Sequence, residues 1–169
     1  MKKIFSWLFD YPNSINLKVS YPRGEAIERL RHATTPYPTA LLASDSTKPS
    51  LVGFVSKDQV RLHKVTFMYA NIFKPIFVGK FVTRDNEILL VGDFKMGSVA
   101  RVTTYIFVGF LSFIQLILLV LIISDPDNRS QFFDPLSFIA LGVLVVYLGK
   151  LIGKKDIPWI ENKIKQALL

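Results

Sequence analysis

Four side chains that could take part in acid–base or binding chemistry are spaced by two residues in two apolar segments. Arg61 and His63 lie in "QVRLHKV", and Asp93 and Lys95 lie in "LLVGDFKM". If both segments are strands, alternation puts each pair on one face of a sheet, where the four could form a charged patch. The solvated side of a half-exposed sheet would show the same pattern, and we favour that interpretation.

Other catalytic and metal-binding patterns are missing from the chain. There is no cysteine, and His32 and His63 are the only histidines, so a zinc site would need help from carboxylates. No phosphate-cradling glycine loop, Gly-x-Ser-x-Gly elbow or His-Glu-x-x-His motif occurs. We therefore expect no metal and no cofactor, and the sequence favours a protein that is not an enzyme.

The first hundred residues have the pattern of a small α+β domain. An expected strand at 15–21 precedes an expected helix at 24–32, and "LVGFVS", "DQVRLHKVTF", "PIFVGKFVTR" and "EILLVGDFKM" are four candidate strands. The short segments "SKD" and "RDNE" suit hairpin turns. These signals predict an antiparallel β-meander covered by one or two helices, over residues 1–100.

Two apolar segments follow the domain and are typical of membrane spans. Residues 102–123 carry no charge over 22 positions, which corresponds to about 33 Å of helix and matches a bilayer core. Residues 136–152 form a shorter second segment, with Asp134 and Pro135 as its expected N-cap and first helical position. The short connector predicts a two-helix transmembrane hairpin over residues 101–153.

Charge predicts how this hairpin is oriented. Residues 1–101 contain 15 Lys and Arg against 8 Asp and Glu, the connector has one Arg against three Asp, and residues 150–169 have five Lys against two acids. Positive flanks stay in the cytoplasm, so we expect both termini to be cytosolic in a bacterial inner membrane. We expect anionic lipid headgroups as partners, and no nucleic acid. The expected membrane-interface residues are Trp7, Arg101, Lys150, Lys154, Lys155 and Trp159.

One polar residue, Gln115, interrupts the first span. Together with Tyr105 it shares a helix side with small residues, and small and polar residues favour contact between membrane helices. We expect Gln115 to hydrogen-bond to the second span or to a helix of another protein. The expected helix-packing residues are Gly109, Ser112, Gln115, Gly142, Gly149 and Gly153.

The last segment, residues 154–169, predicts an amphipathic helix with an apolar stripe. Asp156 is its expected cap and Pro158 suits its first turn. The stripe consists of Ile157, Ile160, Ile164, Ala167 and Leu168. The helix could lie among lipid headgroups with Trp159 as an anchor, or pack on the sheet, and we favour the sheet.

Three segments carry a resemblance to a known group of proteins. They are "GFV" at 53–55, "YANIFKPIFVGKF" at 69–81 and "GDFKMGSVAR" at 92–101. The chain resembles uncharacterised small bacterial membrane proteins in these segments, at the positions of Tyr69, Asn71, Phe73, Pro75 and Gly79. The resemblance implies a β-rich cytosolic domain followed by a membrane hairpin, and it implies no known activity.

The same residues suit a corner between two strands. Asn71 tolerates unusual dihedral angles, Pro75 fixes the entry of the next strand and Gly79 permits a bulge or a close approach. A ligand-contacting loop would use similar residues, so this segment also belongs to the candidate domain site. That site comprises Arg61, His63, Tyr69, Asn71 and Asp93.

These features favour a small integral membrane protein that acts as a non-enzymatic binding or accessory subunit of a membrane complex. The expected partner is a membrane protein or a second copy of the chain. Two alternatives remain open. One is an immunity-type protein that neutralises a membrane-active toxin, and the other is a lipid-sensing or lipid-modifying activity at the membrane surface.

Overall fold

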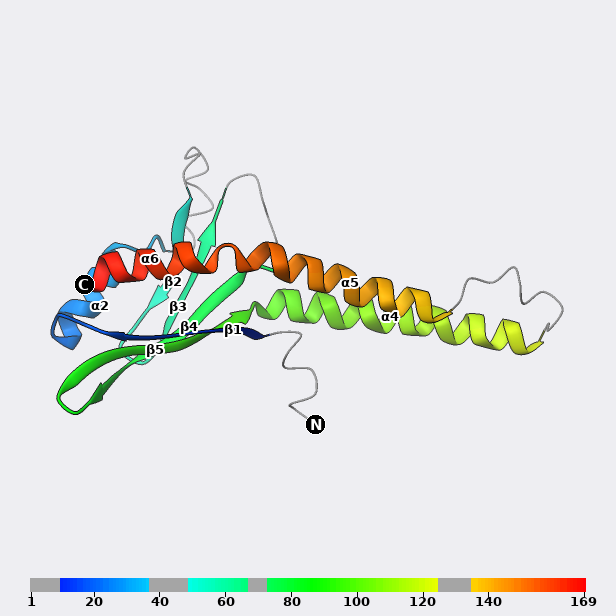
Figure 1. Ribbon diagram of the computed structural model, residues 1–169, viewed down its shortest axis with the longest axis horizontal. Helices are drawn as coiled ribbons and strands as arrows, with labels where there is room; N and C mark the ends of the chain where they lie inside the picture. The colour runs from blue at the N-terminus through cyan, green and yellow to red at the C-terminus, as the bar shows by residue number, and fades with distance from the viewer. Residues whose placement is uncertain (1–9, 37–48, 67–72, 125–134) are drawn as a thin grey trace.

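The chain forms an α+β structure from which two long helices project (Figure 1). The computed structural model describes residues 10–36, 49–66, 73–124 and 135–169. In chain order the elements are β1 Asp10–Lys18, α2 Arg23–His32, β2 Ser50–Val55, β3 Val60–Val65, β4 Pro75–Arg84, β5 Glu87–Met96, α4 Ser98–Ser124, α5 Pro135–Lys154 and α6 Ile157–Leu168.

A five-stranded antiparallel sheet has the order β1-β5-β4-β3-β2. The four predicted meander strands are confirmed as β2 to β5. The predicted first strand starts earlier than expected, at Asp10, and it joins the sheet beside β5 as a fifth strand. An irregularity between Asp10 and Ser14 interrupts its pairing, which explains why simple alternation did not reveal the first half of β1.

Two tight turns connect the meander as predicted. Asp85 and Asn86, between β4 and β5, have φ angles of 50° and 62°, as a two-residue hairpin turn of type I′ requires. Between β2 and β3, the backbone N–H of Ser56 donates to the carbonyl of Gln59. Asn and Asp tolerate positive φ, so the β4–β5 turn follows from local chemistry. The β2–β3 turn is held in addition by the backbone N–H of Gln59, which donates to the Ser56 hydroxyl.

The hydrophobic core lies between one face of the sheet and helices α2 and α6. The rings of Phe77 and Phe94 are 5.5 Å apart at its centre. A Cβ on Gly79 would lie 2.6 Å from Cζ of Phe77, and one on Gly92 would lie 2.8 Å from Cε2 of the same ring. The predicted close approach at Gly79 is therefore confirmed, and the paired register of β4 and β5 continues through it without a bulge.

Helix α6 packs in this core, which was the favoured alternative for the C-terminal segment. Its predicted stripe is buried, with Ala167 partly so, and Trp159 also packs against the core. The backbone N–H of Ser20, just after β1, donates to the carbonyl of Leu168. The first and last described elements therefore belong to one folded domain.

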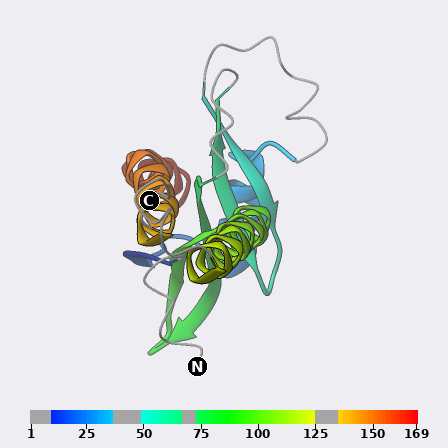
Figure 2. The same ribbon diagram turned by 90° about the vertical axis from the view of Figure 1, so that its right-hand side faces the viewer.

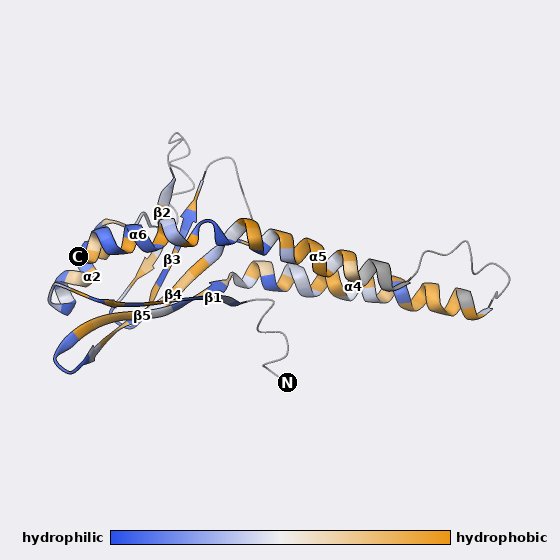
Figure 3. Ribbon diagram, viewed as in Figure 1, coloured by the Kyte–Doolittle hydropathy of each residue, from blue (hydrophilic) through white to orange (hydrophobic). Residues whose placement is uncertain are grey.

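Helices α4 and α5 run antiparallel and side by side away from the domain (Figures 1 and 2). They correspond to the two predicted spans, and Asp134 lies outside the described residues. Residues Ser98–Leu121 are long and apolar enough to cross a membrane, and no other stretch of the described residues passes the same test of length and composition. Apolar residues dominate the outer part of α4 (Figure 3).

Candidate functional site

Several strand ends meet where the two long helices join the domain, a region we call the base of the hairpin. Helix α4 begins two residues after β5 ends. The register puts Pro75 at the start of β4 opposite Met96, and Asp10 at the start of β1 opposite Lys95. The end of α5 reaches the same place, because Gly153 lies against Pro75.

A hydrogen bond between distant segments holds the base together. The Tyr11 hydroxyl donates to the backbone carbonyl of Phe73 at 2.5 Å. Burial raises the pKa of Tyr11, and the negative charge of Asp156 raises it further, so the hydroxyl keeps its proton for donation near neutral pH. The bond fixes β1 to the segment that leads into β4.

Gly149 and Gly153 of α5 pack closely against this hydrogen-bonded pair. A Cβ on Gly149 would overlap the ring of Phe73, and one on Gly153 would lie 2.6 Å from the Phe73 carbonyl oxygen and 2.9 Å from the Tyr11 hydroxyl. The expectation that both glycines serve contact with the first span was wrong. Their missing side chains admit residues of the domain, because α5 passes beside β1 and β4 at this point.

Lys64 and Asp156 form an ion pair at the edge of the base. Lys64 Nζ lies 2.7 Å from Asp156 Oδ1, and the two side chains are only 21% and 27% exposed. Asp156 holds the expected N-cap position of α6, but its side chain makes no capping hydrogen bond to the helix. Lys64 binds the Asp156 carboxylate in place of the N–H groups of α6, because β3 ends beside the α5–α6 junction. No local sequence signal relates these two residues, which are 92 positions apart.

Two further titratable groups near the base are partly desolvated. Burial lowers the pKa of His63 to about 4, with a contribution from the nearby charge of Lys74, so the imidazole is neutral at pH 7. Burial also lowers the pKa of Lys74, while Asp156 opposes this shift. A buried, neutral histidine suits a packing role on the sheet, and its lowered pKa leaves it outside the range of a proton carrier at pH 7.

The predicted charged patch lies on the face of the sheet opposite α2 and α6. Arg61 and Asp93 are both register partners of Val78, and His63 and Lys95 are both partners of Ile76. Strand β4 therefore separates each pair, by two strand spacings or about 10 Å. No ion pair joins them within the described part of the chain, and Tyr69 and Asn71 lie outside it.

The seam between α4 and α5 uses a different side of α4 from the one expected. Ala100 and Thr104 are buried, and a Cβ on Gly142 of α5 would lie 2.7 Å from Cδ1 of Leu111. Gly142 therefore takes the predicted helix-packing role. The seam therefore combines small residues near the start of α4 with Leu111 further along the helix.

The predicted small and polar stripe of α4 points away from α5. Nothing lies within 4 Å of a Cβ built on Gly109, and Tyr105 is 60% exposed. The exposed Ser112 donates to the Val108 carbonyl of its own helix. Gln115 lies at the edge of the seam, where its Nε2 atom is buried without a hydrogen-bond partner among the described residues. A bond from Gln115 to α5 was expected and is not seen there.

Four of the predicted interface residues, Arg101, Lys150, Lys154 and Lys155, lie at the base, and Trp7 lies outside the described residues. Arg101 donates from Nε to the Met96 carbonyl at 2.9 Å, and Lys150 Nζ lies 5.5 Å from the centre of the Tyr11 ring. Lys154 and Lys155 are exposed. Trp159 instead packs against the domain core, with Lys64 Nζ 5.5 Å from its ring.

Within the described residues, no group of three or more His, Cys, Asp and Glu side chains could hold a metal ion. Compared with known proteins, the chain matches no family model, no curated protein and no solved structure. The resemblance to small bacterial membrane proteins therefore stays a prediction. The distinctive feature of the described residues is an α+β domain that packs against the base of an apolar helix pair.

Proposed function

We propose that the protein is a two-span integral membrane protein whose α+β domain is held at the membrane surface and whose hairpin binds another membrane protein. The observation that carries the proposal is the exposed apolar surface of α4. In the most apolar 18-residue stretch of Ser98–Leu121, only 11% is buried inside the protein. Leaving so much apolar surface in water is unfavourable by about 25 cal/mol per Å², whereas lipid would solvate it.

The domain core supports two crossings rather than one. Residues before α4 and residues after α5 pack in the same core, which contains both Ile15 and Ile164. A folded domain lies on one side of a bilayer, so a chain that leaves along α4 must return. Helix α5 runs back beside α4 and supplies that return.

The outward side of α4 supports binding of a further helix. Gly109 and Ser112 are small, exposed residues on this surface, and small residues permit close approach of another backbone in lipid. Because α5 packs on a different side of α4, its presence does not block this surface. The occupant we propose is a transmembrane helix of a partner protein or of a second copy of this chain.

Membrane embedding is tested by washing isolated membranes with alkaline carbonate. The account predicts that the protein stays in the pellet. Release into the supernatant would contradict it.

Partner binding is tested by purifying the tagged protein in a mild detergent. We expect either a stoichiometric partner or a homo-oligomer with the native chain, and its loss with Gly109→Leu. The matched control is Ala140→Leu, which adds the same side chain to an exposed position of α5. A native protein that purifies as a functional monomer, or an equal effect of both variants, would contradict the proposal.

A further inference from the structure

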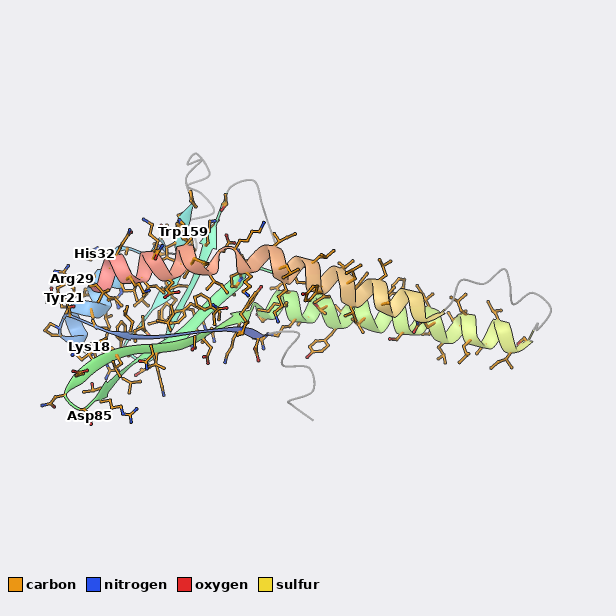
Figure 4. All side chains as sticks on the ribbon, viewed as in Figure 1. Lys18, Tyr21, Arg29, His32, Asp85 and Trp159 are labelled. Carbon is orange, nitrogen blue, oxygen red and sulfur yellow. The ribbon has the colours of Figure 1, made fainter. Side chains whose placement is uncertain are left out.

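Ion pairs are distributed unevenly over the domain. Five of the six ion pairs formed by the described residues lie away from the hairpin, on α2, on α6 or at the far end of the sheet. They are Lys18–Glu87, Arg29–Glu25, Arg31–Glu28, Arg84–Asp85 and Lys165–Glu161. Figure 4 shows Lys18, Arg29 and Asp85 at the end opposite the hairpin. Part of the positive charge there is neutralised within the protein by these pairs.

At the base of the hairpin basic residues outnumber acidic ones. Strand ends and helix ends bring together Lys64, Lys74, Lys95, Arg101, Lys150, Lys154 and Lys155. The acidic residues at this level are Asp10 and Asp156, and Asp156 is already paired with Lys64. Asp93 lies two register positions further from the hairpin than Lys95.

Four of these lysines make no ion pair with any described residue: Lys74, Lys95, Lys154 and Lys155. Burial lowers the pKa of Lys74, so the other three are the candidates for contact with lipid headgroups. Lys154 and Lys155 are exposed and Lys95 is half-buried. Lys95 ends a strand in the first half of the chain and the other two end α5, so only the folded chain brings them to one level. That level is where the apolar part of α4 begins, which is the depth of lipid headgroups for a spanning helix.

We propose that Lys95, Lys154 and Lys155 form a collar that binds the anionic headgroups of phospholipids. The proposal rests on the two-span arrangement above and names the lipid class that the base of the hairpin takes. Phosphate and glycerol-phosphate groups carry the negative charge that would balance the excess of lysines at the base of the hairpin. The adjoining apolar helices would contact the acyl chains of the same lipids, which favours a lipid over a soluble anion or a nucleic acid.

The test uses the full-length protein in bilayer discs made from phosphatidylcholine and phosphatidylglycerol in a 4:1 ratio, at about 0.15 M salt. Native mass spectrometry counts the lipids that stay bound when the protein is released. We expect the native chain to retain phosphatidylglycerol above its share in the disc. The triple variant K95Q/K154Q/K155Q should lose this preference, by about fivefold for each lysine removed.

The matched control is K57Q/K80Q/K163Q, which removes the same charge from lysines that lie outside the base and form no ion pair with described residues. It should keep the native preference. No preference in the native protein, or an equal loss in both triple variants, would overturn the collar. Failure of membrane embedding shows separately, because a protein that carbonate releases from membranes would not remain in the discs.

Discussion

The hydroxyl of Tyr11 is bonded to the backbone carbonyl of Phe73, 62 positions further along the chain, in a space left open by Gly153 of α5. Three segments meet at this contact: the first strand, the entry into β4, and the end of the second long helix. This contact therefore fixes the position of the hairpin relative to the sheet.

Replacing Tyr11 by Phe removes the hydrogen bond and keeps most of the ring. We expect the free energy of unfolding to fall by about 1 kcal/mol, because the donor is lost from a partly buried site. Thermal unfolding in mild detergent, followed by tryptophan fluorescence, measures the change. Tyr21→Phe is the control, since the Tyr21 ring contacts Arg29 while its hydroxyl is in no hydrogen bond that the structure resolves among described residues. Equal effects of the two changes would remove the proposed role of the Tyr11 bond.

Gly153→Ala adds a methyl group against the Phe73 carbonyl and the Tyr11 hydroxyl. We expect a loss of about 1–3 kcal/mol, because neither β4 nor α5 can move away without breaking other contacts. Gly109→Ala meets nothing within 4 Å and should be neutral or stabilising, since Ala favours helix over Gly by about 1 kcal/mol. The same unfolding assay compares them, and a neutral Gly153→Ala would contradict the packing described here.

Several contacts at the base of the hairpin could not be predicted from the sequence, whereas elements set by local periodicity could. The spacing of Ile157, Ile160 and Ile164 was enough to predict α6 and its buried side. Gly149 and Gly153 were recognised as sites of close approach, yet the residue that approaches is set by the meeting of α5 with distant strands.

Asp156 illustrates a second limit of sequence-based prediction. Its position predicted a helix cap, but a lysine brought in by the fold captures its carboxylate. The side of α4 that packs on α5 was also missed. Small and polar residues suggested one side, but the side that contains Ala100, Thr104 and Leu111 packs on α5.

The lowered pKa of His63 makes stability depend on pH. An unfolded histidine titrates near pH 6.5 and the folded one near pH 4, so between these values the unfolded chain binds more protons. The contribution of His63 is therefore complete above about pH 6.5 and is lost as pH falls towards 4, by about 2–3 kcal/mol in total. Unfolding measured from pH 7.5 to 4 should show a smaller decrease for His63→Gln than for the native chain. His32→Gln, at an exposed position, should follow the native curve, and three identical curves would contradict the assignment.

Gln115→Leu should stabilise the hairpin by about 1 kcal/mol. The buried Nε2 atom makes no hydrogen bond among the described residues, and an unsatisfied buried donor is unfavourable. Leucine would fill the same space without that penalty. Unfolding in detergent compares the variant with the native chain. Destabilisation of more than about 1 kcal/mol would show that the amide is bonded in the membrane-embedded protein.

The most direct test of the two-span arrangement uses the absence of cysteine from the chain. Single cysteines are placed before the hairpin at Ser20, at the end of α4 at Ser124, and after the hairpin at Gln166, and intact cells are treated with a membrane-impermeant maleimide. The account predicts labelling of Ser124→Cys from outside, and labelling of Ser20→Cys and Gln166→Cys only after the cells are opened. Labelling of Ser20→Cys and Gln166→Cys from opposite sides, or protection of all three in intact cells, would contradict it.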